Sequence, residues 1–304
     1  MLVSVFIPFA DERDNLQEVV SRVRKGAETA GTDFEIVFVD DGSKDDGGEV
    51  VREIAEKDRR IKLFSHRRNL GLTEAMKTGL FRCKGDYILF FPADLESHPD
   101  EDIPVLLEEL KKGNDVVCGK REGRREFKVF LSKIYNDISN FLFRMNLHDM
   151  NWIKGFKREC LDDLELRSDW HRFIAQILKE KGYSVSEVPV HWYKRKMGRT
   201  HFGLKRIPIS FFDAISVKLI LTFTRAPMRI FGALGLLQCI TGILITVWML
   251  YSSFILGTGE FRLRPLLYMS GALFLSGLIF FFMGFLAELI VSIKEDISKM
   301  EDKE

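Results

Sequence analysis

Two long stretches without any charged residue constrain this chain most strongly. No Asp, Glu, Lys or Arg occurs between Ile230 and Gly259, and none occurs between Pro265 and Ala287. A helix of about 20 apolar residues is long enough to cross the hydrocarbon core of a bilayer. Two buried core helices are the alternative, but soluble helices of this length rarely lack a polar face. The sequence therefore predicts a two-helix transmembrane domain over residues 230–293, followed by a tail over 294–304.

The distribution of basic residues predicts the orientation of these spans. Lys and Arg are frequent between Lys194 and Arg229, whereas the loop between the spans carries only Arg262 and Arg264. Basic residues accumulate on the cytoplasmic side of membrane proteins, so the N-terminal part and the tail are expected in the cytoplasm. The start of the chain lacks the basic and apolar regions of a signal peptide. The four cysteines show no CxxC spacing, which argues against a disulfide framework or a zinc site.

The N-terminal part of the chain alternates short apolar runs with longer amphipathic segments. The runs are rich in β-branched and aromatic residues and predict strands over 2–8, 34–40, 61–65, 87–91 and 115–118. The segments between them predict helices over 15–30, 47–57, 73–82 and 102–112. Strands without polar alternation, each followed by a helix, indicate a mostly parallel sheet with helices on both faces. We therefore expect an α/β nucleotide-binding catalytic domain over residues 1–203.

Acidic residues follow three of the predicted strands. Glu12, Asp41 and Asp94 come after the first, second and fourth strands, and Glu96 lies close to Asp94. Ligands of such sheets bind at the carboxyl ends of the strands, so these side chains are expected to converge. Each could instead brace a turn or cap a helix, but three at neighbouring strand ends favour a binding site. A dinucleotide-binding dehydrogenase and a P-loop ATPase are excluded, because neither glycine-rich motif is present.

Asp94 and Glu96 are the candidate metal ligands. Hard oxygen ligands suit Mg²⁺ or Mn²⁺, and such an ion can neutralise a diphosphate leaving group as a Lewis acid. A DxE pair is a weak signal by itself, and an acidic turn that caps the helix near Pro99 remains the alternative.

Basic residues form two clusters that could bind phosphate. One follows the fifth predicted strand and leads into an amphipathic helix over 127–145; the other precedes a second amphipathic segment over 207–223. The clusters could equally be solvated faces or anchors to anionic lipid. The helices could pack on the sheet or lie in the membrane interface, as we expect for residues 204–229. The clusters comprise Arg121, Arg124, Arg125, Lys128 and Lys133, and Lys194, Arg195, Lys196, Arg199 and His201.

The ordered motifs of the chain resemble glycosyltransferase family 2, and within it the polyprenyl-phosphate glycosyltransferases. In order, they are VSVFIPFADERDNL, FEIVFVDDGSKDD, NLGLTEAMKTGL, GDYILFFPADLESHP, GKR, KGFKRE and EVPVHWYKRKMGRTHFG. The likeness covers nearly the whole chain, and the ordered set is far more specific than any single motif. The resemblance implies a GT-A-type fold followed by interfacial helices and two transmembrane helices. It also implies an acceptor such as dolichyl or undecaprenyl phosphate.

The resemblance further implies roles for individual residues. Asp94 and Arg121 would be catalytic, and Asp94 and Glu96 would bind the metal ion. The nucleotide sugar would be bound by Pro8, Ala10, Glu12, Val39, Asp41, Pro92, Ala93 and Asp94. The acceptor phosphate would be bound by Arg121, Lys128, Ser132, Arg195 and His201.

The expected reaction is an inverting hexose transfer from a nucleotide-diphosphate sugar, with UDP-glucose and GDP-mannose as the leading donors. A polyprenyl phosphate oxygen would attack the anomeric carbon from the face opposite the nucleotide. The second pKa of a phosphate monoester is about 6, so the nucleophile is ionised near pH 7 without a strong general base. Membrane lipids and further copies in a homo-oligomer, such as a tetramer, are the other expected partners. No nucleic-acid partner is expected.

Three departures from the family pattern bear on the site. The common DxD reads Pro92-Ala93-Asp94, a frequent Gln is Glu96, and a frequent Lys is His201. Glu96 can replace the charge of the missing Asp. Two alternatives stay open: an enzyme that extends a polysaccharide or lipid-linked oligosaccharide, and a catalytically idle membrane scaffold. The missing QxxRW motif speaks against the first, although Asp169–Arg172 lies in the comparable region, and Pro92 supports the second.

Overall fold

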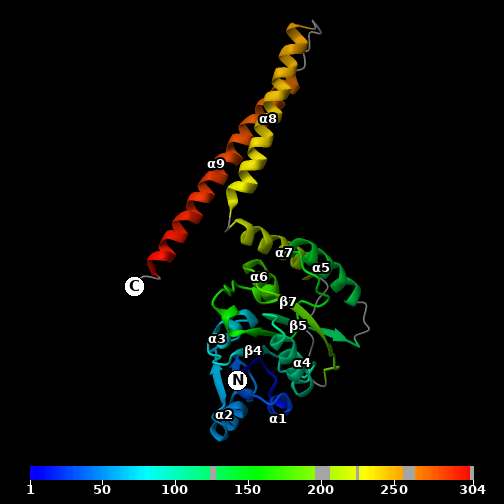
Figure 1. The fold of residues 1–304 in the computed structure, drawn as a ribbon, viewed down its shortest axis with the longest axis vertical. Coiled ribbons are helices and arrows are strands. Elements are labelled where there is room, and N and C mark those ends of the chain that lie inside the picture. Colours follow the sequence, from blue (N-terminus) through cyan, green and yellow to red (C-terminus); the bar gives the residue numbers. More distant parts are fainter. Residues whose placement is uncertain (124–127, 196–205, 224–225, 256–263, 302–304) are drawn as a thin grey trace. The chain divides into compact units, whose positions relative to one another are not determined.

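The computed structural model describes residues 1–123, 128–195, 206–223, 226–255 and 264–301 (Figure 1). The chain divides into two compact units, Met1–Ile215 and Ser216–Glu304. Each unit is described by itself.

A seven-stranded sheet forms the centre of the first unit, in the order β3-β2-β1-β4-β6-β5-β7. The strands are β1 (Leu2–Phe9), β2 (Asp33–Asp40), β3 (Ile61–Ser65), β4 (Tyr87–Phe90), β5 (Val116–Glu122), β6 (Lys154–Lys157) and β7 (Val185–His191). Only β6 runs antiparallel to its neighbours, β4 and β5, so the mostly parallel α/β sheet that the sequence predicts is confirmed. The prediction was wrong about the end of β5, because Arg121 lies within this strand rather than after it. Strands β6 and β7 were not predicted.

Helices cover both faces of this sheet (Figure 1). On one face, buried side chains of β1 such as Val5 and Ile7 join a single apolar cluster with α1, α2 and α4. On the other face Phe6 contacts α3 so closely that a Cβ at Gly79 would lie 2.2 Å from its ring. The helices are α1 (Arg13–Thr29), α2 (Gly47–Lys57), α3 (Leu72–Leu80), α4 (Pro99–Lys111), α5 (Lys128–Phe143) and α6 (Ile174–Lys181). Burial on both faces explains why the strands read as continuous apolar runs.

A buried polar network braces the amino-terminal end of the sheet, away from the candidate site. The Glu35 carboxylate accepts hydrogen bonds from the Ser4 hydroxyl at 2.6 Å, the Lys62 ammonium at 2.5 Å and the Lys84 amide at 2.5 Å. Only 5% of Glu35 is exposed. Burial by itself would raise the pKa of this carboxyl, but the hydrogen bonds more than offset that effect and lower it from 4.5.

The substitution Glu35→Gln is expected to lower the free energy of unfolding by about 2–3 kcal/mol at pH 7, because two charge-assisted hydrogen bonds are lost. The stabilisation by an acid with a lowered pKa is complete above its unfolded pKa and is lost as the pH falls through its folded pKa. The difference between variant and wild type should therefore shrink below pH 4.5. Thermal unfolding at pH 7 and at acidic pH measures this. Glu108→Gln on the surface serves as the control, and an equal loss at both pH values would contradict the role of the charge.

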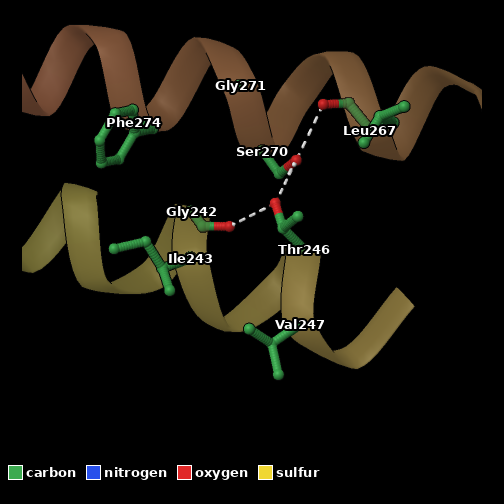
Figure 2. A pocket seen from close by; sticks show the side chains of 8 residues that line it. All are labelled: Gly242, Ile243, Thr246, Val247, Leu267, Ser270, Gly271 and Phe274. Atoms are coloured by element: carbon green, nitrogen blue, oxygen red, sulfur yellow. Dashed lines mark hydrogen bonds between the residues drawn. The ribbon is translucent and has the colours of Figure 1, made fainter. Parts of the chain in front are cut away.

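The second unit contains two long helices, α8 (Pro227–Phe254) and α9 (Arg264–Glu301). They pack through glycines, since a Cβ at Gly235 would lie 2.6 Å from the Gly277 carbonyl oxygen. The Thr246 hydroxyl lies 3.1 Å from the Ser270 hydroxyl beside a shallow groove lined by Gly242 and Gly271 (Figure 2). Both helices are long and apolar enough to cross a membrane.

The observed helices differ from the predicted spans at their ends. The first begins three residues earlier than the uncharged stretch, at Pro227, where the Met228 amide donates to the Glu288 carboxylate at 3.1 Å. The second continues through most of the predicted tail and remains helical to Glu301. Its last turns are charged, so helix propensity rather than hydrophobicity sets this end.

Two helices carry the predicted interfacial segments, α5 and α7 (Arg206–Phe223). Phe141 on α5 is 86% exposed and Phe212 on α7 is 66% exposed. Single exposed apolar side chains are common on protein surfaces, so these two residues do not by themselves locate the helices. The location of these helices in the membrane interface remains a prediction.

Candidate active site

The loops after β1 and β2 are joined at the carboxyl edge of the sheet. Pro8 and Val39 are partners in the register of β1 and β2. Beyond them, the Asp11 amide donates to the Ser43 hydroxyl at 3.1 Å, and the Lys44 amide donates to the Asp11 carboxylate at 2.6 Å. The predicted nucleotide-binding residues Pro8, Ala10, Val39 and Asp41 therefore come from two adjacent strand ends, and their binding role remains a prediction.

The Asp41 carboxylate holds the loop that follows β3. Its oxygens accept hydrogen bonds from the amides of Leu70 at 2.9 Å and Gly71 at 2.8 Å, and the His66 ring nitrogen lies 2.8 Å away. Asp41 therefore does not cap α2, which was the structural alternative. No sequence signal indicated that this carboxylate would join the second and third strand ends.

Gly42 allows this close approach. Its φ is +69°, and a Cβ would lie 2.2 Å from the Arg68 carbonyl carbon. Gly42→Ala is therefore expected to cost about 2–4 kcal/mol of stability, from the left-handed backbone and the overlap together. Gly31→Ala is the matched control, because its φ is +59° but no atom lies within 4 Å of the added Cβ. Thermal unfolding compares the two, and equal losses would show that the overlap with the loop contributes nothing.

The acidic turn after β4 contains the candidate metal ligands. The Glu96 amide donates to the Asp94 carboxylate at 3.1 Å, and Leu95 between them has a φ of +57°. Burial and the nearby charge of Glu96 raise the pKa of Asp94 to about 6. Neither carboxylate caps α4, whose first residue follows His98.

This turn fits a hard divalent cation. Two carboxylates whose charges repel each other at a strand end form an oxygen donor set of the kind that Mg²⁺ or Mn²⁺ prefers. A cation bound there would remove the repulsion that raises the pKa of Asp94. The role of Asp94 and Glu96 as metal ligands remains a prediction.

Arg121 faces the acidic turn from β5. Its positive charge acts on Asp94 and partly offsets the rise in the pKa of that carboxyl. Its Nε and Nη2 donate to the Asp149 carboxylate at 2.5 and 3.0 Å, and its guanidinium lies 5.3 Å from the centroid of the Trp152 ring. The other terminal nitrogen, Nη1, has no recorded partner in the described part of the chain and can donate two hydrogen bonds to a ligand. Asp149 and Trp152 were missed, because isolated residues before a short strand give no periodic signal.

The segment after β7 folds over the same rim. The Trp192 indole donates to the Glu96 carboxylate at 3.2 Å, and the Tyr193 amide donates to the Glu96 carbonyl at 2.9 Å. Arg195 forms an ion pair with Glu12. Glu12 and Arg195, which the resemblance assigns to different substrates, thus contact each other.

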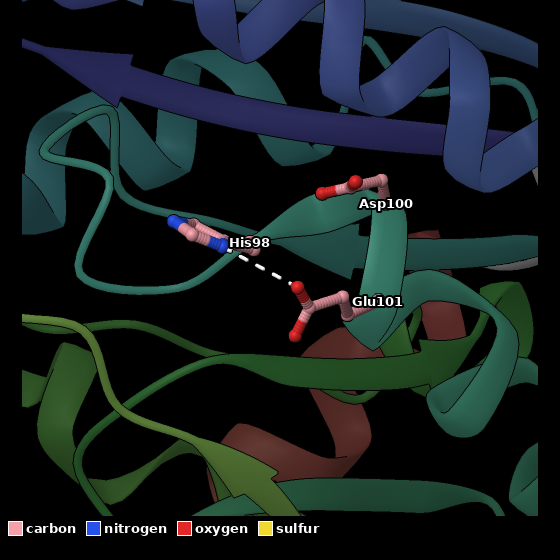
Figure 3. A group of neighbouring side chains, drawn as sticks. All are labelled: His98, Asp100 and Glu101. Carbon is pink, nitrogen blue, oxygen red and sulfur yellow. Dashed lines mark ion pairs between the residues drawn. The ribbon is translucent and has the colours of Figure 1, made fainter.

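A second group of potential metal ligands lies at the start of α4. Atoms of His98, Asp100 and Glu101 lie within 4.8 Å of one another (Figure 3). The two Asp100 oxygens already pair with Arg22 at 2.8 Å and Lys25 at 2.9 Å. The Glu101 carboxylate accepts from the Tyr193 hydroxyl. Asp100 is thus already paired with two cations, and Glu101 links the start of α4 to the segment after β7.

Three predicted phosphate-binding residues cannot be placed in the site. Lys128 and Ser132 lie on α5, where the structure describes only their backbone. His201 lies outside the described residues. The roles of these three residues remain predictions.

Comparison with known proteins identifies the family. Residues 4–204 match Glycosyl transferase family 2. The undecaprenyl-phosphate 4-deoxy-4-formamido-L-arabinose transferase of Edwardsiella ictaluri (strain 93-146) is 28% identical over 97% of this chain and 90% of its own length. The protein with the same description from Enterobacter sp. (strain 638) is 27% identical over the same shares.

Solved structures share the fold of the first unit. Glucosyl-3-phosphoglycerate synthase from Mycobacterium tuberculosis aligns with a TM-score of 0.56 at 19% identity, covering 71% of this chain and 78% of that one. Mannosyl-3-phosphoglycerate synthase from Rubrobacter xylanophilus aligns with a TM-score of 0.58 at 17% identity, covering 72% and 74%. The family match covers most of the chain, and the fold has the expected GT-A form. The chain therefore belongs to glycosyl transferase family 2 and is a glycosyltransferase.

Proposed function

We propose that this glycosyltransferase moves a single sugar from a nucleotide-diphosphate donor to a polyprenyl phosphate, with inversion at the anomeric carbon. The observation that carries the proposal is that the acidic turn of Asp94 and Glu96 lies close enough to Arg121 on β5 for the guanidinium charge to act on Asp94. A site with this polarity can receive two phosphate-bearing substrates. The relatives from Edwardsiella and Enterobacter, which align over 97% of this chain, are described as undecaprenyl-phosphate transferases, and this supports the lipid acceptor.

The donor would bind at the ends of β1, β2 and β4. Pro8 and Val39 are buried at these ends, Ala10 is partly exposed, and Asp41 stabilises the loop beside them. Asp94 and Glu96 would hold Mg²⁺ or Mn²⁺, which when bound neutralises charge on the diphosphate leaving group. The glucosyl-3-phosphoglycerate synthase that shares this fold is described in complex with Mn²⁺ and UDP, which supports the use of a divalent ion.

The acceptor phosphate would approach Arg121. Asp149 fixes the guanidinium through two hydrogen bonds, so Nη1 keeps one orientation and would donate to the phosphate. Because the phosphate is already ionised near pH 7, the protein has to position it and balance its charge rather than remove a proton. Arg195, together with Lys128, Ser132 and His201, would complete the phosphate site.

The two apolar helices would hold the enzyme at the membrane, where its lipid acceptor is located. Helices α8 and α9 would cross the membrane, and the many basic residues before α8 support a cytoplasmic location for the first unit. A polyprenyl phosphate keeps its headgroup at this interface, so a water-soluble nucleotide sugar and a membrane-bound acceptor could meet at one rim.

The donor sugar is tested by transfer to undecaprenyl or dolichyl phosphate from a panel of labelled nucleotide sugars. The panel contains UDP-glucose, GDP-mannose and a nucleotide-activated 4-deoxy-4-formamido-L-arabinose, the sugar that the relatives' description names. We expect one labelled lipid carrying one sugar from one of these donors. A ladder of products would indicate an enzyme that extends chains. The absence of both transfer and metal-dependent donor hydrolysis would indicate an idle scaffold.

A further inference from the structure

A lysine is buried on the sheet side of this site. Lys154 begins β6, where it is paired with Phe90 of β4 and Cys118 of β5, and only 2% of it is exposed. Both neighbouring strands lead to the site, because Phe90 precedes the turn of Asp94 and Cys118 stands three residues before Arg121. The lysine therefore lies between the two strands whose ends carry the proposed chemistry.

The surroundings of Lys154 do not explain its presence as a purely structural residue. Its ammonium donates to the Trp152 carbonyl at 2.9 Å, and this is its one recorded hydrogen bond in the described part of the chain. A buried ammonium with three donors and one acceptor costs folding free energy. Burial lowers the pKa of Lys154 and the charge of Arg121 acts in the same direction, while Cys118 and the Asp149 carboxylate act in the opposite direction. An apolar side chain of similar length would fill this space at lower cost.

The same residues surround Arg121. Asp149 accepts from its Nε and Nη2, and Trp152 lies under its guanidinium. An isolated pair of Arg121 and Asp149 has no net charge, which would weaken its attraction for a phosphate. A second cation beside Asp149 changes this balance, because two positive charges and one negative charge leave the cluster with a net positive charge.

We propose that Lys154 is a positioning residue for the phosphate-binding Arg121. It fixes the backbone of Trp152, and its charge offsets that of Asp149, so that Arg121 can hold its orientation without losing its attraction for the substrate phosphate. This inference rests on the proposed function, since it names the residue that prepares Arg121 for the acceptor phosphate.

The test is Lys154→Met, measured by steady-state transfer and by thermal unfolding. We expect the KM for the polyprenyl phosphate to rise about 10-fold with kcat within about threefold, while the melting temperature stays equal or rises because a buried charge is removed. Lys157→Met is the matched control, because Lys157 ends the same strand and pairs with Asp115 at 2.6 Å. An unchanged KM, or a joint loss of kcat and melting temperature without a change in KM, would overturn the inference.

A double-mutant cycle tests the charge balance directly. Asp149→Asn is expected to raise KM about 10-fold in the wild-type background, where it loosens Arg121. In the Lys154→Met background it should change KM less than threefold, because it also restores the net positive charge. Additive effects would show that the two residues act independently and would contradict the proposal.

Binding separates this inference from the proposed reaction. The dissociation constant of a short prenyl phosphate is measured by calorimetry without donor, for wild type and Lys154→Met. A wild type that binds but does not transfer would refute the proposed reaction, and the ratio of dissociation constants would still decide the role of Lys154. Equal constants overturn the inference. A wild type that neither binds nor transfers overturns both.

Discussion

Replacing Asp94 by asparagine is expected to lower sugar transfer by about 100- to 1000-fold or more. The change keeps the shape of the side chain but removes the negative charge on which Glu96 and Arg121 act. Loss of one well-placed electrostatic partner of a developing charge costs about this much in other enzymes. Because a metal ion is the proposed partner, the concentration of Mn²⁺ needed for half-maximal residual activity should also rise. Transfer measured across a Mn²⁺ titration provides both values.

Stability distinguishes this effect from misfolding. The raised pKa of Asp94 indicates that its charge is unfavourable in the folded protein, so Asp94→Asn should melt at the same or a higher temperature than wild type. Asp102→Asn is the matched control for removing the charge of a buried acid. Burial also raises the pKa of Asp102, to about 7. Its carboxylate, however, accepts a hydrogen bond from the His98 amide at the start of α4 and not within the acidic turn. Near-normal transfer by Asp94→Asn would remove this residue from the site.

Replacing Arg121 by methionine should lower transfer by about 100-fold or more. The positive charge of its guanidinium acts on Asp94, and Nη1 has no recorded partner in the described part of the chain. Removal of the guanidinium leaves the half-buried Asp149 without this partner and the substrate phosphates without a fixed donor. Arg121→Lys should recover little activity, because an ammonium cannot make the same two hydrogen bonds with a carboxylate.

The chain offers an internal control for this change. Arg60 also donates from Nε and Nη2 to an aspartate, Asp58, at 2.9 and 2.8 Å, and its guanidinium lies 4.2 Å from the ring centroid of Phe34. This pair has the same chemistry but lies at the other end of the sheet. Arg60→Met should therefore keep transfer within about twofold of wild type. Equal activity losses for the two variants would show that the Arg121 effect is general rather than local.

Local patterns explain why much of the fold could be predicted. Three of the first four strands, β1, β2 and β4, are largely apolar, and each of the four is followed by a helix, so period and composition identify them. Strands β6 and β7 escape prediction for different reasons. β6 has four residues, of which two are lysines, and β7 alternates exposed and buried positions and contains a proline.

The predicted site residues follow the carboxyl ends of neighbouring strands, as expected, and their binding roles remain predictions. The rule that ligands bind at carboxyl strand ends brought together Glu12, Asp41 and Asp94. It could not show that Asp41 binds backbone amides, or that Glu12 pairs with Arg195 from the far end of the domain. These partners lie dozens of residues away in sequence, and a single sequence carries no signal for such pairings.

The sequence by itself determined the family, the order of elements, the two apolar helices and the acidic rim, because each depends on local periodicity, hydrophobicity or an ordered motif. Only the tertiary structure decided which charges meet. The antiparallel insertion of β6 between β4 and β5 places Lys154, Trp152 and Asp149 beside Arg121. Strand order is set by packing between distant segments, so the partners of a buried charge follow from the folded sheet and not from spacing along the chain.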